Sequence, residues 1–313
     1  METDFRYDGP LFDAHSHAAD EAALKLMVEI GSRFGVERAL LILHNAQAAR
    51  YRELYPGRFV FAKFFLSTSL WTDDFATIRN DVVSMREQGY SVAKTHFAPF
   101  WRDRLPEGAS GLPSVQDNKF DSFFNLLSNL KIPVVIHIAD PDTYYATKYA
   151  DSTIYGTKEN HISEFEGRLS KNPQVVFQTA HFAAQPELHR LENLGRMFDA
   201  HPNLYVDTGS ARWMVRELGR DPKKARAFVT RYSRRILFGT DCVARTYESD
   251  YYEGRYISER LLWESNVRGV PLPFTDSDTA NSGGTFINGL SLPKNVLKRI
   301  YWENALALHA SSE

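Results

Sequence analysis

The sequence has almost no cysteine, no long hydrophobic run and no excess of charge of either sign. Its single cysteine, Cys242, cannot form a disulfide within the chain or build a cysteine-rich zinc site. The longest purely aliphatic run, Ala39 to Leu43, is far shorter than the roughly 20 apolar residues that cross a bilayer. The 37 basic and 39 acidic residues give a formal charge of −2, so binding to nucleic acid or to an anionic membrane is not expected. Residues 1–10 lack the basic start and apolar stretch of a secretory signal, which favours a reducing, cytoplasmic location.

What the chain does contain is ample material for a packed core, since 43% of its residues are hydrophobic and 24% are charged. Short apolar runs rich in Val, Ile and Phe recur along it, and each precedes a longer amphipathic segment. The eight runs are Leu11 to His17, Ala39 to Asn45, Phe59 to Leu66, Ser91 to Phe97, Pro133 to Ala139, Val175 to His181, Leu204 to Thr208 and Ile236 to Asp241. This alternation predicts an α/β fold, a single closed (β/α)8 TIM barrel domain over residues 1–313. Long connections at 98–116 and 140–158 are expected at the C-terminal face of the barrel, and 270–290 is expected to be an irregular excursion.

Residues that can bind a metal lie at the ends of four of these predicted strands. Asp13, His15 and His17 form the sequence DAHSH, and the alternation of a strand places all three side chains on one face. The fifth, sixth and eighth runs end near His137, His181 and Asp241. A lone histidine at a strand end is more often structural than functional. Four strands that deliver such groups to one rim of a barrel instead predict a metal site.

This pattern resembles the amidohydrolase superfamily, and within it the amidohydrolase-related branch, which contains acid decarboxylases, lactonases and hydratases. The resemblance spans nearly the whole chain. It rests on DAHSH at 13–17, His137, TAH at 179–181, FGTD at 238–241 and WENALAL at 302–308. The resemblance implies a distorted barrel and a divalent metal, commonly zinc.

The resemblance also implies a role for each residue. The implied metal ligands are His15, His17, His137 and Asp241, and His181 is implied to activate or orient the reacting water. The residue types agree, because neutral imidazoles and a carboxylate suit one zinc or manganese ion. An open coordination position would lower the pKa of water from 15.7 towards ~7 and create hydroxide at neutral pH. Asp241 could in addition pass a proton to a leaving group.

Lys94 and His96, on the predicted fourth strand, leave two questions open. Binuclear members of the superfamily place a carboxylated lysine on this strand, where it bridges two metals. The interpretation favoured here is a single metal, with Lys94 as an ammonium that binds a substrate anion. His96 has the same parity as Lys94, and a substrate contact and a packed core position are equally open for it.

The loops at the predicted mouth supply further candidates for substrate binding, namely Trp101, Tyr144 and Arg212. Aromatic rings beside arginine suit a planar carboxylated ligand, and the alternative is a lid that packs on itself. His44 could line the site or lie where the following helix begins. Solvated or capping roles are expected for the remaining histidines, His161, His189, His201 and His309.

The leading hypothesis is a metal-dependent hydrolase in which metal-bound hydroxide attacks a carbonyl, lactone or amide bond of a small, possibly carboxylated substrate. The first alternative is a zinc-dependent, non-oxidative decarboxylase of an unsaturated or aromatic acid, of the aminocarboxymuconate-semialdehyde decarboxylase type. The second is a catalytically silent or metal-free binding barrel. The expected partner is a small-molecule substrate, and assembly into a homo-oligomer remains open.

Overall fold

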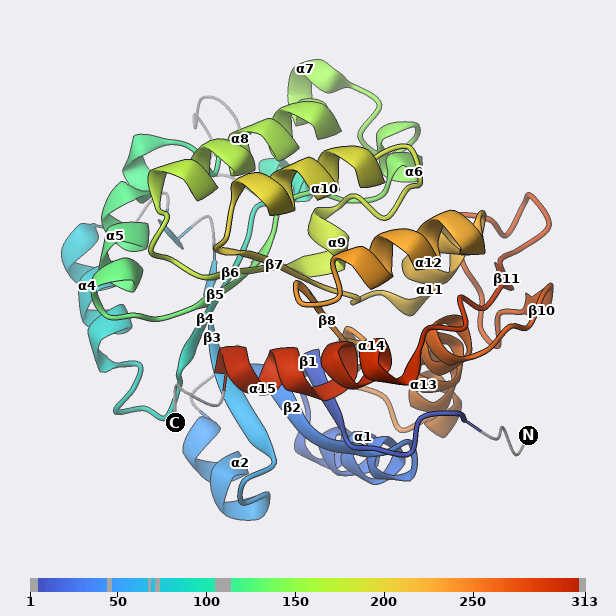
Figure 1. The fold of residues 1–313 in the computed structure, drawn as a ribbon. Coiled ribbons are helices and arrows are strands. Elements are labelled where there is room, and N and C mark those ends of the chain that lie inside the picture. The colour runs from blue at the N-terminus through green and yellow to red at the C-terminus, as the bar shows by residue number, and fades with distance from the viewer. Residues whose placement is uncertain (1–4, 44–46, 67–68, 71–73, 105–113, 310–313) are drawn as a thin grey trace.

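The computed structural model describes residues 5–43, 47–66, 69–70, 74–104 and 114–309 (Figure 1). Within these residues, nine strands form one sheet in which every neighbouring pair runs parallel. The strands are β1 (Leu11–Ala18), β2 (Val36–Leu43), β3 (Phe59–Leu66), β4 (Val92–His96), β5 (Val134–His137), β6 (Phe177–Thr179), β7 (Leu204–Asp207), β8 (Ile236–Leu237) and β9 (Cys242–Ala244). Their order is β8-β7-β6-β5-β4-β3-β2-β1-β9, so each strand through β8 lies beside its neighbour in the chain.

The sheet closes through the segment between β8 and β9, which are two parts of one interrupted strand. β8 pairs with β7, and β9 pairs with β1. Between them, the N–H of Ala14 donates to the carbonyl of Phe238 at 2.8 Å, and the N–H of Asp241 donates to the carbonyl of His15 at 2.8 Å. The predicted α/β TIM barrel is therefore confirmed. The eighth strand is broken because Asp241 has a φ of 55°, which a strand cannot continue through.

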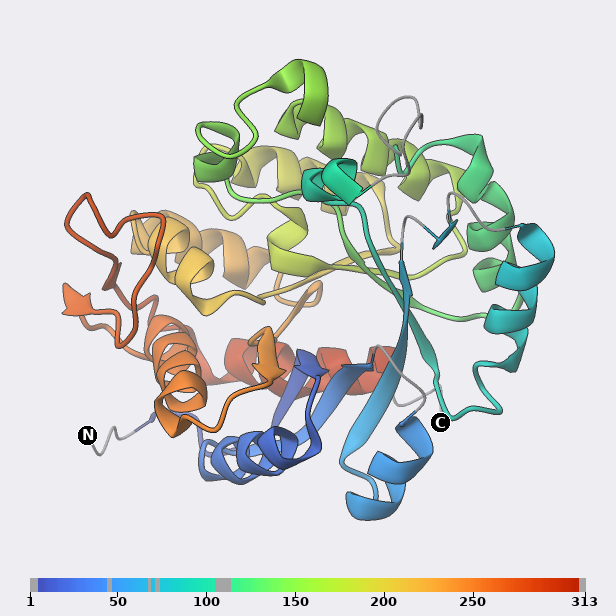
Figure 2. The same ribbon diagram turned by 180° about the vertical axis from the view of Figure 1, so that it is seen from behind.

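Helices surround the sheet on its outside (Figures 1 and 2). The α-helices are α1 (Glu21–Arg33), α2 (Ala48–Leu54), α4 (Phe75–Ser84), α5 (Asp121–Asn129), α6 (Asp142–Tyr145), α7 (Ser152–Tyr155), α8 (Lys158–Lys171), α9 (Ala180–Ala183), α10 (Leu191–Ala200), α11 (Ala211–Leu218), α12 (Pro222–Arg231), α13 (Ser249–Glu264), α14 (Lys294–Lys298) and α15 (Asn304–His309). Two further segments are 3₁₀-helical, η1 (Pro99–Arg104) and η2 (Asn118–Phe120), and η3 (Arg299–Glu303) is π-helical. No helix among the described residues is long and apolar enough to span a bilayer.

The alternation of side chains along each strand divides the core in two. On β2, Leu40 and Ile42 belong to a small apolar cluster inside the barrel, whereas Leu41 and Leu43 pack outward against the helices. Ala305 of α15 packs into the same inner cluster. One end of the barrel is thus filled with apolar side chains and covered by α15, which leaves the carboxyl ends of the strands for polar residues.

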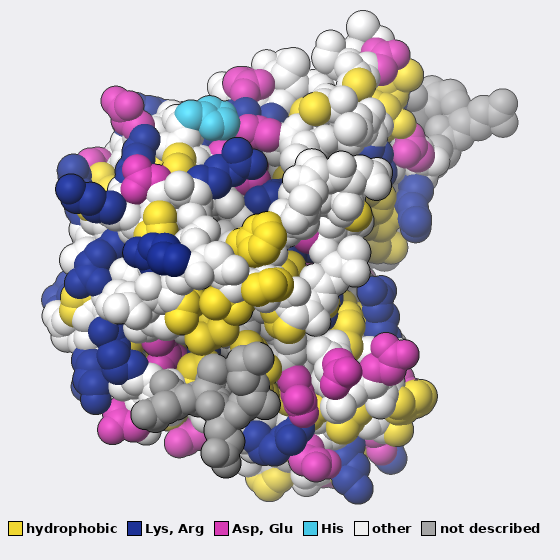
Figure 3. Space-filling view, turned by 90° about the vertical axis from the view of Figure 1, so that its right-hand side faces the viewer, with side chains coloured by type: hydrophobic (Ala, Val, Ile, Leu, Met, Phe, Trp, Pro, Cys, Tyr) yellow, Lys and Arg dark blue, Asp and Glu magenta, His cyan; other side chains and the backbone are white. Residues whose placement is uncertain are grey.

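The predicted excursion contains a two-stranded antiparallel ladder of β10 (Val270–Pro271) and β11 (Phe286–Ile287). We call residues 270–287 the hairpin. It projects beside α13 (Figure 2). Basic and acidic side chains alternate over the face shown in Figure 3, in keeping with the nearly balanced charge of the chain.

Candidate metal centre

Two histidines of β1 and the residue that breaks the eighth strand form the tightest group of possible ligands. Nε2 of His15 lies 3.3 Å from Nε2 of His17. Oδ1 of Asp241 lies 3.5 Å from the first of these nitrogens and 3.4 Å from the second. Since His15 and His17 are two residues apart on one strand, their rings share a face, and the positive φ of Asp241 brings its carboxylate to them.

Asp207, the last residue of β7, fixes the protonation of His15. Its carboxylate accepts hydrogen bonds from Nδ1 of His15 at 3.0 Å and from Nε2 of Gln178 at 2.8 Å. It also accepts from the backbone N–H groups of His181 and Gly209. Burial alone would raise the pKa of this carboxyl, but His15, His181 and Gln178 outweigh it, and the pKa lies below its usual range. Because Nδ1 of His15 carries the proton, Nε2 presents a lone pair towards the group, as a metal ligand requires.

The protonation states of His17 and Asp241 also suit the binding of a cation. Burial lowers the pKa of His17 to about 4, so its ring is neutral at pH 7. Burial would raise the pKa of Asp241, but His15 and His17 outweigh it and hold the pKa well below its usual range. Two imidazoles and one carboxylate are a donor set that fits zinc or a similar divalent ion.

A chain of hydrogen bonds runs beside this group from Asp140 through His137 to His181. Oδ1 of Asp140 lies 3.2 Å from Nε2 of His137, and Nδ1 of His137 lies 3.1 Å from Nε2 of His181. Tyr149 donates its hydroxyl to the other oxygen of Asp140 at 2.9 Å. With the carboxylate as acceptor at one end, Nε2 of His181 must donate, and its Nδ1 carries a lone pair. This Nδ1 is buried and has no partner among the residues described.

The structure therefore brings together three of the four predicted ligands. His15, His17 and Asp241 offer atoms within 4.8 Å of one another, whereas both ring nitrogens of His137 bond to Asp140 and His181. His137 as a fourth ligand stays a prediction. A second cluster of His15, His181 and Asp207 also meets the distance criterion. It fits a metal less well, because Asp207 already accepts four hydrogen bonds.

Lys94, His96 and Trp101 lie on the β4 side of the site. Lys94 is 1% exposed, and burial lowers the pKa of its amine to about 8 although Asp207 and Asp241 oppose the shift. Nδ1 of His96 accepts a hydrogen bond from Nε1 of Trp101 at 2.8 Å, and the His96 ring stacks on His137 at 4.0 Å. These two residues thus support the wall around His137.

The two predicted substrate residues from later loops contact each other. Nη2 of Arg212, on α11, donates to the hydroxyl of Tyr144, on α6, at 3.2 Å. Arg212 also lines a pocket of about 270 Å³ that includes Asp241. A larger cavity of about 670 Å³ lies at the amino ends of β3 and β4, where Phe59 and Ser91 line it. The candidate ligands lie at the opposite, carboxyl ends of the strands, so this cavity is not part of the candidate site.

Several residues of the site are not among those predicted from the sequence. Asp207 ends an apolar run just as Asp241 does, and Asp140 follows His137 by three residues, so a search for carboxylates after each run would have found both. The prediction for His309 was wrong, because His309 is fully buried and its Nε2 donates to Oε1 of Gln178 at 2.7 Å. His44 lies outside the described residues.

Around the site, the backbone has positive φ values, which residues other than glycine rarely adopt. His181, Ser210 and Asp241 have φ values of 56°, 65° and 55°. Phe182 to Ala184 continue in the same left-handed region, so α9 is a left-handed turn. Each such residue costs about 1–2 kcal/mol, and strain of this kind concentrates at functional sites.

Known proteins share the fold of this chain, and a family model matches most of it. Among solved structures, the chain is similar to 5-carboxyvanillate decarboxylase from Sphingomonas paucimobilis, with 10% identity, a TM-score of 0.55, and coverage of 97% of this chain and 99% of that one. It is also similar to a fructose-bisphosphate aldolase from Campylobacter jejuni, with 10% identity, a TM-score of 0.44, and coverage of 96% and 86%. The first of these likenesses shows the fold alone, and the second is too weak to carry an argument. A search of curated proteins gave no match. A family model described as amidohydrolase matches residues 84–309, a span that holds His137, His181 and Asp241, and the chain therefore belongs to the amidohydrolase family.

Proposed function

We propose that this enzyme is a metal-dependent hydrolase, in which water attacks a carbonyl, lactone or amide carbon of a small carboxylated compound. The observation that carries the proposal is the set of His15, His17 and Asp241, whose ligand atoms lie 3.3 to 3.5 Å apart at the carboxyl ends of the strands. One zinc ion suits this set best, and manganese would also suit it.

Each residue of the site has a defined task in this proposal. When bound, the divalent ion supplies a Lewis acid that polarises a substrate oxygen and lowers the pKa of water. Nδ1 of His181 takes the proton of the attacking water, because burial and the nearby His137 lower the pKa of His181 to about 4 and leave its ring neutral at pH 7. Nε2 of His181 donates to His137, and His137 donates to Asp140, so the new positive charge is delocalised towards a carboxylate. The proton held on His181 is then passed to the leaving group, and the ionised carboxylate of Asp241 is placed to relay it.

A second candidate is a non-oxidative decarboxylase that uses the same ligands. The observation in its favour is the arginine-lined pocket beside Asp241, which could hold an organic acid. In this reaction the carbon–carbon bond to the carboxylate breaks, carbon dioxide leaves, and a proton is added to the carbon. A neutral His181 is better suited to accept a proton than to deliver one, and hydrolysis is therefore proposed first.

A product assay in ¹⁸O-labelled water separates the two candidates. With a panel of lactones, amides and aromatic acids, hydrolysis would place ¹⁸O in the product, whereas release of carbon dioxide without uptake of water would refute the hydrolase proposal. Metal analysis of protein purified without chelators tests the remaining alternative. We expect about one equivalent of zinc, and less than about half an equivalent would support a metal-free barrel.

Variants of the ligands provide the control. His15→Ala and Asp241→Ala should each remove metal and reduce turnover by several orders of magnitude, because each removes a ligand but little packing. Circular dichroism should stay close to that of the wild type. Near-full turnover with metal still bound in either variant would contradict the ligand assignment.

A further inference from the structure

Three arginines from different elements line the pocket beside Asp241. Arg212 comes from α11, Arg245 follows β9, and Arg255 comes from α13. Asp241 contributes the one carboxylate among the described residues that line this pocket, and its charge is directed at His15 and His17. We call Arg212, Arg245, Arg255 and the space between them the arginine pocket. It carries an excess of positive charge next to the candidate metal centre.

Two of these guanidinium groups, those of Arg212 and Arg255, are held in place without being neutralised, whereas Arg245 is exposed. Nη1 of Arg212 donates to the hydroxyl of Ser277 at 2.8 Å. Nη1 of Arg255 donates to the backbone carbonyl of Tyr251 at 2.7 Å, and its guanidinium lies 3.7 Å from the centre of the Tyr251 ring and 5.0 Å from that of Phe274. Within the described part of the chain, none of the three arginines forms an ion pair with a carboxylate. Three uncompensated guanidinium groups, two of them fixed, attract an anion.

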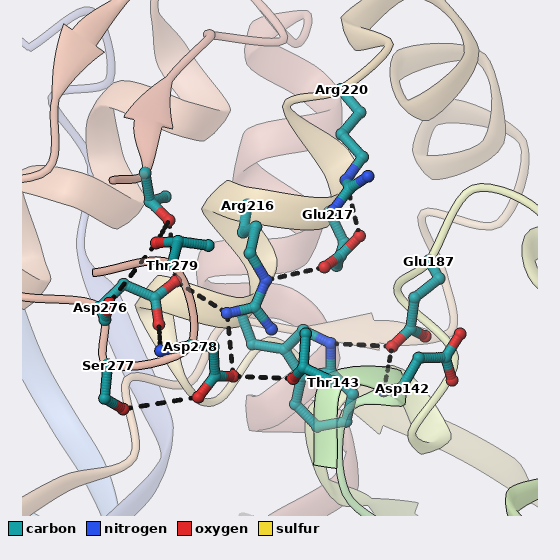
Figure 4. Close-up of polar contacts among 12 residues, drawn as sticks. Asp142, Thr143, Glu187, Arg216, Glu217, Arg220, Asp276, Ser277, Asp278 and Thr279 are labelled. Atoms are coloured by element: carbon teal, nitrogen blue, oxygen red, sulfur yellow. Dashed lines mark hydrogen bonds and ion pairs between the residues drawn. The ribbon is translucent and has the colours of Figure 1, made fainter. Parts of the chain in front are cut away.

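The neighbouring Arg216 shows that the chain has carboxylates at hand. One turn further along α11, Arg216 donates to Glu217 at 2.7 Å and to Asp276 and Asp278 of the hairpin at 2.7 and 3.0 Å (Figure 4). Thr143 of α6 binds the same oxygen of Asp278, so the hairpin is tied to both helices. The acidic residues of the hairpin therefore neutralise Arg216 and not Arg212.

The hairpin, which is bound to Arg216, also forms one wall of the arginine pocket. Phe274 and Thr275 line the pocket from the hairpin, directly before Asp276, which is 4% exposed and bound to Arg216. Arg255 thus lies against both Tyr251 and Phe274, and its hydrogen bond to the carbonyl of Tyr251 further restricts the guanidinium. A guanidinium held in this way is suited to bidentate binding of a carboxylate or phosphoryl group.

We infer that the arginine pocket binds an oxyanion carried by the part of the substrate that does not react, and so positions the reacting carbon beside Asp241. The inference rests on the proposed function for the place of the chemistry. The shared ligand chemistry is a group with several negatively charged oxygens, and it could be a carboxylate or a phosphate ester. Arg245 and Arg255 would be specificity-determining residues, together with Arg212.

Binding of small anions tests the inference without the unknown substrate. Inorganic phosphate and succinate are titrated calorimetrically into the zinc-loaded protein and into chelator-treated protein, at constant ionic strength. We expect at least one of the two to bind both forms, and the tighter one identifies a phosphoryl or a carboxylate group. Arg255→Met, which keeps the contact with the two rings, should weaken binding at least tenfold, and Arg245→Gln should weaken it as well. Arg231→Gln, which removes an exposed arginine of α12 that pairs with Asp199, should bind as the wild type does.

Absence of binding of either anion to the wild type, or equal affinity in Arg255→Met, would overturn the inference. Circular dichroism and zinc content of the Arg255→Met protein establish that it is folded. The two proposals fail separately. Zinc binding without anion binding refutes the arginine pocket alone, whereas anion binding by a protein that cannot hold zinc refutes the metal-dependent hydrolase.

Discussion

Replacement of Asp207 by asparagine would change the protonation of His15 without removing any ligand of the candidate metal centre. The carboxylate of Asp207 faces four N–H donors, two of them on each oxygen. An asparagine side chain offers one carbonyl oxygen and one NH₂ group. In either orientation, two N–H donors would therefore oppose an NH₂ group.

The backbone donors of His181 and Gly209 cannot change their polarity, but the ring of His15 can. We expect the carbonyl oxygen to stay with the backbone and the NH₂ group to face Nδ1 of His15. The ring would then shift its proton from Nδ1 to Nε2, where a proton blocks metal binding. Loss of a hydrogen-bond partner of this kind typically costs 10- to 100-fold in metal affinity, or about 1.4–2.8 kcal/mol. Gln178 also loses its acceptor, which should lower the free energy of unfolding by about 1–3 kcal/mol.

Competition with a chromogenic chelator measures the zinc affinity, and urea denaturation measures the free energy of unfolding. Asp199→Asn is the matched control, because Asp199 is exposed and contacts only Arg231 and Tyr232 in the structure as described. A variant Asp207→Asn that is less stable but holds zinc as tightly as the wild type would refute the argument. Asp207 would then support the fold and not the tautomer of His15.

Four further predictions follow from the same geometry. His181→Asn should keep its zinc while the rate falls about 100-fold or more, and a parallel loss of zinc and rate would place His181 among the ligands. Metal analysis should find one ion in the wild type and one in Lys94→Ala, while KM rises in the variant. Two ions in the wild type, with a loss of metal in Lys94→Ala that short carboxylates restore, would contradict this prediction. Burial lowers the pKa of His309 from 6.5 to about 3, so the unfolded chain binds more protons than the folded chain between pH 3 and pH 6.5. The free energy of unfolding should therefore fall as the pH falls through this window. The contribution of this group is up to about 1.4 kcal/mol per pH unit. His309→Gln should flatten that slope in urea titrations, and an unchanged slope would exclude His309 as its source. Gly209→Ala should weaken zinc binding, because its Cβ would lie 3.0 Å from Nδ1 of His15 and 3.1 Å from Nδ1 of His181; zinc affinity equal to that of the wild type would show that the cluster yields at little cost.

The fold could be predicted because buried parallel strands are apolar on both faces and form continuous apolar runs in the sequence. The third run, Phe59 to Leu66, coincides with β3, and the seventh differs from β7 by one residue. The eighth run was predicted as one strand over Ile236 to Asp241. Its break depends on the positive φ of a non-glycine residue, which the tertiary structure imposes and which composition does not reveal.

Of the candidate site, only the grouping of residues at the ends of the strands could be predicted from the topology of a barrel. Since the carboxyl ends of all strands meet at one rim, the grouping of His15 and His17 with Asp241 follows from strand order alone. The partners of these residues do not follow from it. Whether His137 turns towards a metal or towards His181 depends on rotamers and on Asp140, which no pattern of strands specifies.

A line of hydrogen bonds through the barrel shows what local patterns leave out. Nε2 of His309, on α15, donates to Gln178; Gln178 donates to Asp207; and Asp207 accepts a hydrogen bond from Nδ1 of His15. Pairs in this line are 131 and 192 positions apart in the chain. Because each acceptor fixes the next donor, a helix that covers one end of the barrel helps to set the tautomer of a candidate ligand at the other end. α15, whose sequence contributes to the family resemblance and whose His309 was expected to be solvated or capping, thus forms part of the support of the candidate metal centre.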